Sequence, residues 1–157
     1  MIAIHEMTVR ELPLCEPLAR SFFEEMRLPG VFSMDSFTKN WTVFLATPGY
    51  TAAIFGLWKD GALIGALGAL MAPDLHTGQP TANELFWFVS MEHRHGSGAL
   101  RLVKQFEQWA HQHGATDFRL VHLLGPNGER FPKIYEHLGY RPIEINYLKP
   151  NPNRKEG

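Results

Sequence analysis

The most distinctive chemistry of the sequence lies in a short run with two glycines, His93-Arg94-His95-Gly96-Ser97-Gly98. The run stands where a predicted strand passes into a predicted helix. Glycines at such a junction let backbone N–H groups approach a ligand closely, and the start of a helix carries a partial positive charge. Arg94 adds a full charge that a phosphate can accept. The run therefore predicts an anion site suited to a diphosphate, although a tight turn would also account for the glycines.

Two common phosphate-binding motifs do not fit this run. A P-loop requires Gly-x-x-x-x-Gly-Lys-Ser/Thr, a string that the sequence does not contain. The dinucleotide fingerprint requires a third glycine three residues after the second, and that position is Arg101. The pattern thus favours a different kind of phosphate-binding loop.

Glu84 is the first candidate for a proton acceptor. Strand alternation predicts Glu84, Phe86 and Phe88 on one face of a strand over residues 82–90. A carboxylate among aromatic rings is expected to have a raised pKa, so that it could take a proton directly or through water. His122, on a predicted strand over residues 117–124, is an alternative base. The residues leave the choice between Glu84, His122 and water open.

The elements that must position these residues follow from hydrophobic periodicity and turn signals. Their expected order is β-α-α-β-β-β-α-β-α-β, an α/β fold with a mixed sheet. A strand, a long amphipathic helix and another strand imply one parallel crossover within a mostly antiparallel sheet. Asp60-Gly61 predicts a tight hairpin turn. The expected strands cover residues 2–7, 50–58, 62–71, 82–90, 117–124 and 141–149, and the last helix covers 129–138.

Composition limits the classes of function. The chain has 157 residues, 45% hydrophobic and 20% charged, with a formal net charge of −1. We expect one domain over residues 1–149 and a frayed polar tail over 150–157. Because there is no basic excess, a broad nucleic-acid surface is not expected. A single cysteine, Cys15, excludes an intramolecular disulfide and a multi-cysteine zinc site, and we expect no bound metal.

The sequence also predicts a protein outside membranes. Its N-terminal residues lack the basic and apolar regions of a secretory signal. The most apolar run, residues 62–72, is shorter than the roughly 20 residues that span a bilayer as a helix. We therefore expect a soluble cytoplasmic protein.

Three features together resemble the GNAT family of N-acetyltransferases. The run from His93 to Gly98 is similar to the family's Gln/Arg-x-x-Gly-x-Gly/Ala motif, with histidine in the first position. The segment Ile134-Tyr135-Glu136-His137-Leu138-Gly139-Tyr140 resembles the family's Tyr-x-x-x-Gly-Phe/Tyr ending. The order of elements over residues 2–149 is the third. Within the family, residues 84–89 and 144–149 resemble members found in phage genomes.

The resemblance implies an acetyl-CoA-dependent N-acetyltransferase. In such enzymes the fourth and fifth strands splay apart, an acetyl group passes to a primary amine by direct attack in a ternary complex, and acetyl-CoA is the only cofactor. The resemblance implies Tyr135 as the proton donor to the thiolate, and Glu84 is the expected base on the strand argument above. The implied coenzyme contacts are backbone groups of Phe88, Val89, Arg94, His95, Gly96, Ser97, Gly98 and Ala99.

Two questions stay open at this point. A non-catalytic module that binds acyl-CoA with the same fold is the alternative function. The sequence does not identify the amine acceptor, and it leaves homodimer formation open.

Overall fold

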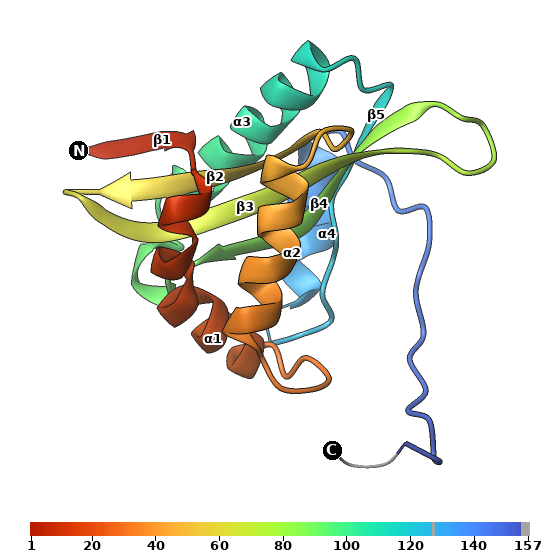
Figure 1. Ribbon diagram of the computed structural model, residues 1–157, viewed down its shortest axis with the longest axis horizontal. Helices are drawn as coiled ribbons and strands as arrows, with labels where there is room; N and C mark the ends of the chain where they lie inside the picture. The colour runs from red at the N-terminus through yellow and green to blue at the C-terminus, as the bar shows by residue number, and fades with distance from the viewer. Residues whose placement is uncertain (127, 155–157) are drawn as a thin grey trace.

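The chain folds around one five-stranded sheet, in a computed structural model that describes residues 1–126 and 128–154. The strands are β1 (Ile2–Glu6), β2 (Ala52–Lys59), β3 (Ala62–Pro73), β4 (Pro80–Val89) and β5 (Asp117–Arg119). They lie side by side in chain order, as Figure 1 shows. The first four pair antiparallel, and β5 pairs parallel with β4. The mixed α/β fold expected from the sequence is confirmed.

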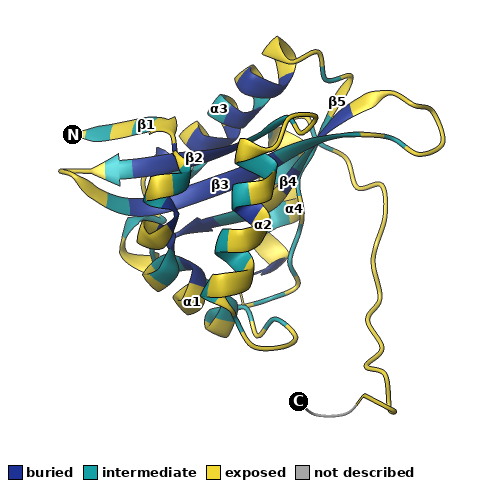
Figure 2. Cartoon of the chain, viewed as in Figure 1, coloured by how far each residue is buried: buried dark blue, intermediate teal, exposed yellow. Residues whose placement is uncertain are grey.

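Helices cover both faces of the sheet. They are η1 (Val9–Cys15), α1 (Glu16–Glu25), α2 (Met34–Ala46), η2 (Met91–His93), α3 (Gly98–Gln112), η3 (Gly128–Arg130) and α4 (Phe131–His137). One buried cluster joins η1, α1 and α2 to the sheet, and a second joins α3 to the opposite face. Figure 2 shows the buried residues concentrated on the central strands and on the inner side of α3. Within the described residues, none of these helices is long and apolar enough to cross a membrane.

Local signals explain several element boundaries. Asp60 and Gly61 have positive φ angles of 50° and 83°, the conformation that a tight hairpin turn between β2 and β3 requires. The Ser33 side chain accepts a hydrogen bond from the Ser36 N–H and so caps the start of α2. Gly114, at φ 78°, lies just after the end of α3. These boundaries follow from the sequence alone.

A bulge in β4 changes the faces predicted for its side chains. Gly68 of β3 lies opposite Phe86, but the next residue, Ala69, lies opposite Glu84, so Leu85 is an extra residue. Phe86 consequently packs with the cluster beneath α1 and α2, whereas Ala69 belongs to the α3 cluster and Glu84 shares its face. The prediction that Glu84, Phe86 and Phe88 share one face is wrong, because alternation alone does not reveal a bulge.

The two strands at the end of the sheet part early. β5 pairs with β4 only between residues 117–119 and 81–83. From Glu84 to Val89, β4 continues while pairing with β3 alone. This divergence is the splay expected between the fourth and fifth strands, and β5 is shorter than the predicted 117–124.

The strand predicted over residues 141–149 does not form. These residues carry no regular structure, and all of residues 141–154 are exposed. Figure 1 shows the segment leaving the body near β5 and running clear of it. Alternating residues make a segment able to form a strand, but a strand also requires a partner edge. Of the predicted tail, residues 150–154 are exposed, and residues 155–157 lie outside the described part.

Candidate active site

Glu84 lies at the point where β4 and β5 part. It is one of two buried polar residues among the described part of the chain, with 5% of its surface exposed. Its Oε2 accepts a hydrogen bond of 2.8 Å from the Val121 N–H, just beyond β5. Burial disfavours the charged carboxylate more than this bond favours it, and raises the pKa of Glu84 to about 7. The raised pKa predicted from the sequence is confirmed.

Tyr135 of α4 is bonded to the same residue, Val121. Its hydroxyl donates a hydrogen bond of 2.9 Å to the Val121 carbonyl. Burial and, secondarily, the negative charge of Glu84 hold the pKa of Tyr135 well above its ordinary value. The phenol therefore keeps its proton at neutral pH. Glu84 and Tyr135, 51 residues apart in sequence by their numbers, are thus held by the N–H and the carbonyl of one residue.

His122, the alternative base, is engaged elsewhere. Its Nε2 lies 2.6 Å from the Gly128 carbonyl, and because a carbonyl can only accept, Nε2 carries the hydrogen. The ring packs against Phe131 and Tyr135, with centroids 5.8 Å and 6.5 Å away. His122 therefore fastens the segment leading into α4 and packs beside Tyr135, and its Nδ1 keeps a lone pair.

Beyond Asn83, β4 has no neighbouring strand on its β5 side, and some of its backbone groups face the gap between the two diverging strands. The Ser90 N–H donates to the Ile64 carbonyl of β3. In an antiparallel ladder the bonding direction alternates, so Phe88 also turns its backbone toward β3, while Trp87 and Val89 turn theirs toward the open edge. Val89 thus fits the predicted contact with a ligand in the gap. Phe88 does not present its backbone there, and Trp87, which sequence reasoning missed, does.

In the loop before α3 the Gly96 N–H donates a long hydrogen bond of 3.5 Å to the His93 carbonyl, while the N–H groups of His95, Ser97 and Gly98 have no backbone partner in the described part of the chain. His95, Gly96 and Ser97 are exposed, and the Ser97 side chain forms no capping hydrogen bond with the helix. The first N–H groups of an α-helix have no partner within the helix. At Gly96 an added Cβ would meet only the His93 carbonyl, 3.8 Å away. This open, uncapped helix start, with Ala99 in its first turn, fits a diphosphate.

Arg94, predicted to add charge to this anion site, is paired instead. Its guanidinium forms two hydrogen bonds with the Glu25 carboxylate, 2.5 and 2.6 Å long, and its Nε donates to the Val89 carbonyl. The ion pair lowers the pKa of Glu25. Arg94 therefore ties the end of α1 to the end of β4. The partner could not be predicted, since Glu25 lies 69 residues away in sequence.

Gly98 is required by packing. A Cβ built on it would lie 2.7 Å from Leu57 Cδ2, in the core beneath α3. Close packing against β2 therefore accounts for the glycine at this position. Gly98 lets α3 start close to the sheet, while Gly96 borders the space in front of the helix.

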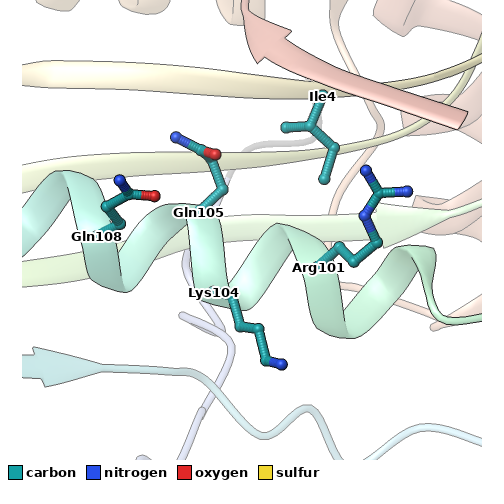
Figure 3. Close-up of a pocket in the computed structure, with 5 residues that line it drawn as sticks. All are labelled: Ile4, Arg101, Lys104, Gln105 and Gln108. Carbon is teal, nitrogen blue, oxygen red and sulfur yellow. The ribbon is translucent and has the colours of Figure 1, made fainter.

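Two depressions flank α3. One, of about 250 Å³, lies between the start of α3 and α4 and is lined by Leu100, Lys133, Ile134, His137 and Leu138. The other, of about 270 Å³, lies between α3 and β1 and is shown in Figure 3, where Ile4 faces Arg101 and Gln105. Neither Glu84 nor Tyr135 lines either depression; the first includes Ile134, the neighbour of Tyr135 in α4, and the second includes no residue of α4.

No cluster of three or more metal-binding side chains occurs in the described residues. Cys15 is buried in the core, and burial raises the pKa of its thiol to about 12. A thiol with this pKa is not a nucleophile at neutral pH. Cys15 is therefore not a candidate nucleophile.

Comparison with known proteins agrees with this geometry. Residues 13–140 match the sequence model of the acetyltransferase (GNAT) family, and the chain belongs to that family. No functionally curated protein matches the sequence. Similarity to members found in phage genomes stays a prediction.

Solved structures of acetyltransferases share the fold. A ribosomal-protein-alanine N-acetyltransferase from Brucella melitensis is 20% identical, with a TM-score of 0.73 over 96% of this chain and 99% of that one. An AAC(6')-Iy complex with a coenzyme A bisubstrate analogue is 19% identical, with a TM-score of 0.76 over 96% and 98%. Glucosamine-6-phosphate N-acetyltransferase from Arabidopsis thaliana is 12% identical, with a TM-score of 0.68 over 95% and 97%.

Proposed function

We propose that the protein is an acetyl-CoA-dependent N-acetyltransferase that moves an acetyl group to a primary amine by direct attack in a ternary complex. One observation carries the proposal: a buried carboxyl with a pKa of about 7 and a protonated phenol are held by the N–H and the carbonyl of the same residue, Val121. Acetyl transfer to an amine needs one group to take a proton and another to give one. Glu84 and Tyr135 supply this pair at the opening between two strands.

The residues present fit the coenzyme. The uncapped start of α3, with Gly96 and Ser97 exposed before it, offers backbone N–H groups to a diphosphate. The outward backbone groups of Trp87 and the N–H of Val89, whose carbonyl already accepts from Arg94, can bind the amides of a pantetheine arm as a neighbouring strand would. Bound there, acetyl-CoA would supply the thioester. The groove between α3 and α4 gives the rest of the coenzyme an apolar surface.

The two catalytic residues are coupled through charge. At neutral pH a carboxyl with a pKa of about 7 is partly ionised, so Glu84 can accept the proton of an incoming ammonium group. Once protonated, Glu84 no longer repels ionisation of Tyr135, and one of the two causes of the raised tyrosine pKa disappears. Tyr135 then becomes a stronger hydrogen-bond donor to the departing thiolate. Proton uptake at Glu84 thus prepares proton donation at Tyr135.

The names of related structures indicate which acceptors to try. They include N-acetyltransferases named for ribosomal-protein alanine, an aminoglycoside and glucosamine 6-phosphate. An assay of free thiol release from acetyl-CoA should therefore use a peptide with an N-terminal alanine, an aminoglycoside and an amino-sugar phosphate. Acetylated product, identified by mass spectrometry and reduced in Tyr135→Phe, is the expected result. Acetyl-CoA binding without turnover on a broad amine panel would favour the non-catalytic module.

A further inference from the structure

A row of aromatic rings on the α1 and α2 side of the sheet reaches the strand that carries Glu84. The Phe37 ring of α2 lies 6.0 Å from that of Phe32, in the loop before α2, and 5.5 Å from that of Phe86 in β4, measured between centroids. The Phe86 ring is stacked on Phe88 at 5.0 Å. Phe88 is buried, whereas the other three rings are partly exposed. The row therefore leads from the surface to within two residues of Glu84.

The loop before α2 also meets the segment that follows β5. A Cβ built on Gly125 would collide with the Met26 side chain, so the two stretches of chain are in contact. Figure 1 shows the loop, in orange, close to this segment, in cyan. The same segment contains Val121, whose N–H binds Glu84. Leu85, the extra residue of the bulge, is 47% exposed and adds an apolar side chain next to Glu84 in sequence. Apolar groups thus surround Glu84 on this side of the sheet.

Charged side chains are scarce in the same place. Arg27 is the one Asp, Glu, Lys or Arg in the three stretches of chain that meet there, which are residues 26–33, 85–88 and 120–125. Glu25, just before the loop, is paired with Arg94. Asp35 is exposed and lies about 200° around α2 from Phe37, so it faces away from the row. These stretches therefore lack the carboxylates that would bind a polycationic substrate.

The row lies on the face of the sheet opposite to α3. The buried cluster around Phe88 joins η1, α1 and α2 to the sheet, and the other cluster joins α3 to it. Glu84 reaches from β4 to the Val121 N–H across the gap between the faces. A coenzyme at the start of α3 and a molecule on the ring row can therefore be bound at the same time, as a ternary complex requires.

We propose that the acceptor is a primary amine carried by an uncharged aromatic group, and that the rings of Phe32, Phe37 and Phe86 bind this group. The assignment rests on the proposed function, because Glu84 takes a proton from the amine. Aromatic pairs prefer offset or edge-to-face contacts, which partly exposed rings offer to an incoming ring. The amine nitrogen bonds to the acetyl carbon as the carbon–sulfur bond breaks. Of the two protons that the ammonium group loses, one passes to Glu84, and the other balances the proton that Tyr135 gives to the thiolate.

A matched pair of amines tests the substrate class. 2-Phenylethylamine and ethanolamine share the aminoethyl unit and differ only in a phenyl ring in place of a hydroxyl group. The kcat/KM of the parent protein is expected to be higher for 2-phenylethylamine by about tenfold or more, mainly through a lower KM. Equal values, or a preference for an aminoglycoside or an amino-sugar phosphate, would overturn the substrate class and leave acetyl transfer itself standing.

Two substitutions in α2 locate the site. Phe37→Leu removes the central ring of the row and is expected to bring the ratio of the two kcat/KM values close to one. Phe44→Leu, about 10 Å further along α2, is the matched control and should keep the ratio, because Phe44 packs against Trp41 and Tyr50. Phe32→Leu, in the loop, is expected to act as Phe37→Leu does and serves if that variant has a lower melting temperature. The same loss of preference in the Phe44 variant would contradict the assignment of the row.

Binding measured without turnover separates this assignment from acetyl transfer. With coenzyme A present, 2-phenylethylamine is expected to bind more tightly than ethanolamine in calorimetry, and Phe37→Leu is expected to weaken its binding. If this holds while no amine gives an acetylated product, acetyl transfer is refuted and the row stands as an amine site. If other amines are acetylated and 2-phenylethylamine does not bind, acetyl transfer stands and the aromatic acceptor is refuted.

Discussion

Replacing Glu84 by glutamine should make the protein more stable and less active at the same time. Glutamine keeps the shape of the side chain, and its amide oxygen can still accept the Val121 N–H bond. The substitution removes the ability to hold a negative charge in a buried site and replaces one carboxyl oxygen by an amide nitrogen, a change that is the same at every pH. Stability and turnover should therefore move in opposite directions, which a purely structural role for Glu84 would not produce.

The raised pKa of Glu84 gives the size and direction of the stability effect. Between pH 4.5 and about 7 the folded protein retains a proton that the unfolded chain has released, so this group's contribution to stability falls as pH rises through that window. Each pKa unit corresponds to about 1.36 kcal/mol. Raising the pKa of Glu84 from 4.5 to about 7 therefore means that the ionised carboxylate costs the folded state about 3 kcal/mol. The glutamine variant avoids this cost, which is largest above pH 7.

Urea unfolding at pH 4 and pH 8 measures the effect. The free energy of unfolding of Glu84→Gln should exceed that of the parent by about 3 kcal/mol more at pH 8 than at pH 4. Glu136→Gln, on the exposed surface of α4, is the matched control and should show no such difference. A stability difference that is the same at both pH values would refute the reasoning.

Turnover of the same variant supplies the second half of the test. The parent's rate should rise with an apparent pKa near 7 as Glu84 ionises. Glu84→Gln should be slow at neutral pH and recover only at high pH, where the amine loses its proton unaided. Affinity for acetyl-CoA should barely change. A rate profile identical to the parent's would assign the proton to water or His122.

Four further substitutions separate chemistry, coenzyme binding and packing. Tyr135→Phe should lower turnover by about 10²–10⁴-fold with acetyl-CoA affinity within a few-fold of the parent; an unchanged rate would make the hydroxyl structural. Gly96→Val should weaken acetyl-CoA binding at least tenfold in calorimetry without unfolding the protein, whereas Gly98→Val should lower the melting temperature, because its side chain meets the core. Equal effects of Gly96→Val and Gly98→Val on acetyl-CoA binding and on melting temperature would contradict these assignments. Arg94→Ala should destabilise the fold by about 1–3 kcal/mol, since it leaves a partly buried Glu25 carboxylate unpaired. A change in acetyl-CoA affinity without a change in stability would instead support a phosphate contact for Arg94.

Local sequence signals predicted the elements that carry the site. The amphipathic pattern of α3 places Leu102, Val103 and Phe106 in the core, and each is buried. The Asp60-Gly61 turn formed where its residue types predicted it. Such features depend on residues that are close together in sequence, so they can be predicted from the sequence alone.

Features that depend on distant partners could not be predicted. The bulge at Leu85 moves Glu84 to the α3 face, and nothing in strand alternation indicates it. Glu84 nevertheless has the expected raised pKa, because both faces of β4 are buried. The role of Val121 and the pairing of Arg94 with Glu25 arise only when β5, α4 and α1 meet. The alternating pattern over residues 141–149 likewise does not indicate whether another strand lies close enough for these residues to pair with it.

A crystal structure with acetyl-CoA bound would test the central claim most directly. The account predicts the diphosphate on the backbone N–H groups from Gly96 to Ala99, and the pantetheine arm along the open edge of β4 beyond Glu84. The thioester sulfur should lie within hydrogen-bond reach of the Tyr135 hydroxyl. Coenzyme bound instead in the depression between β1 and α3, or a sulfur remote from both Glu84 and Tyr135, would contradict it.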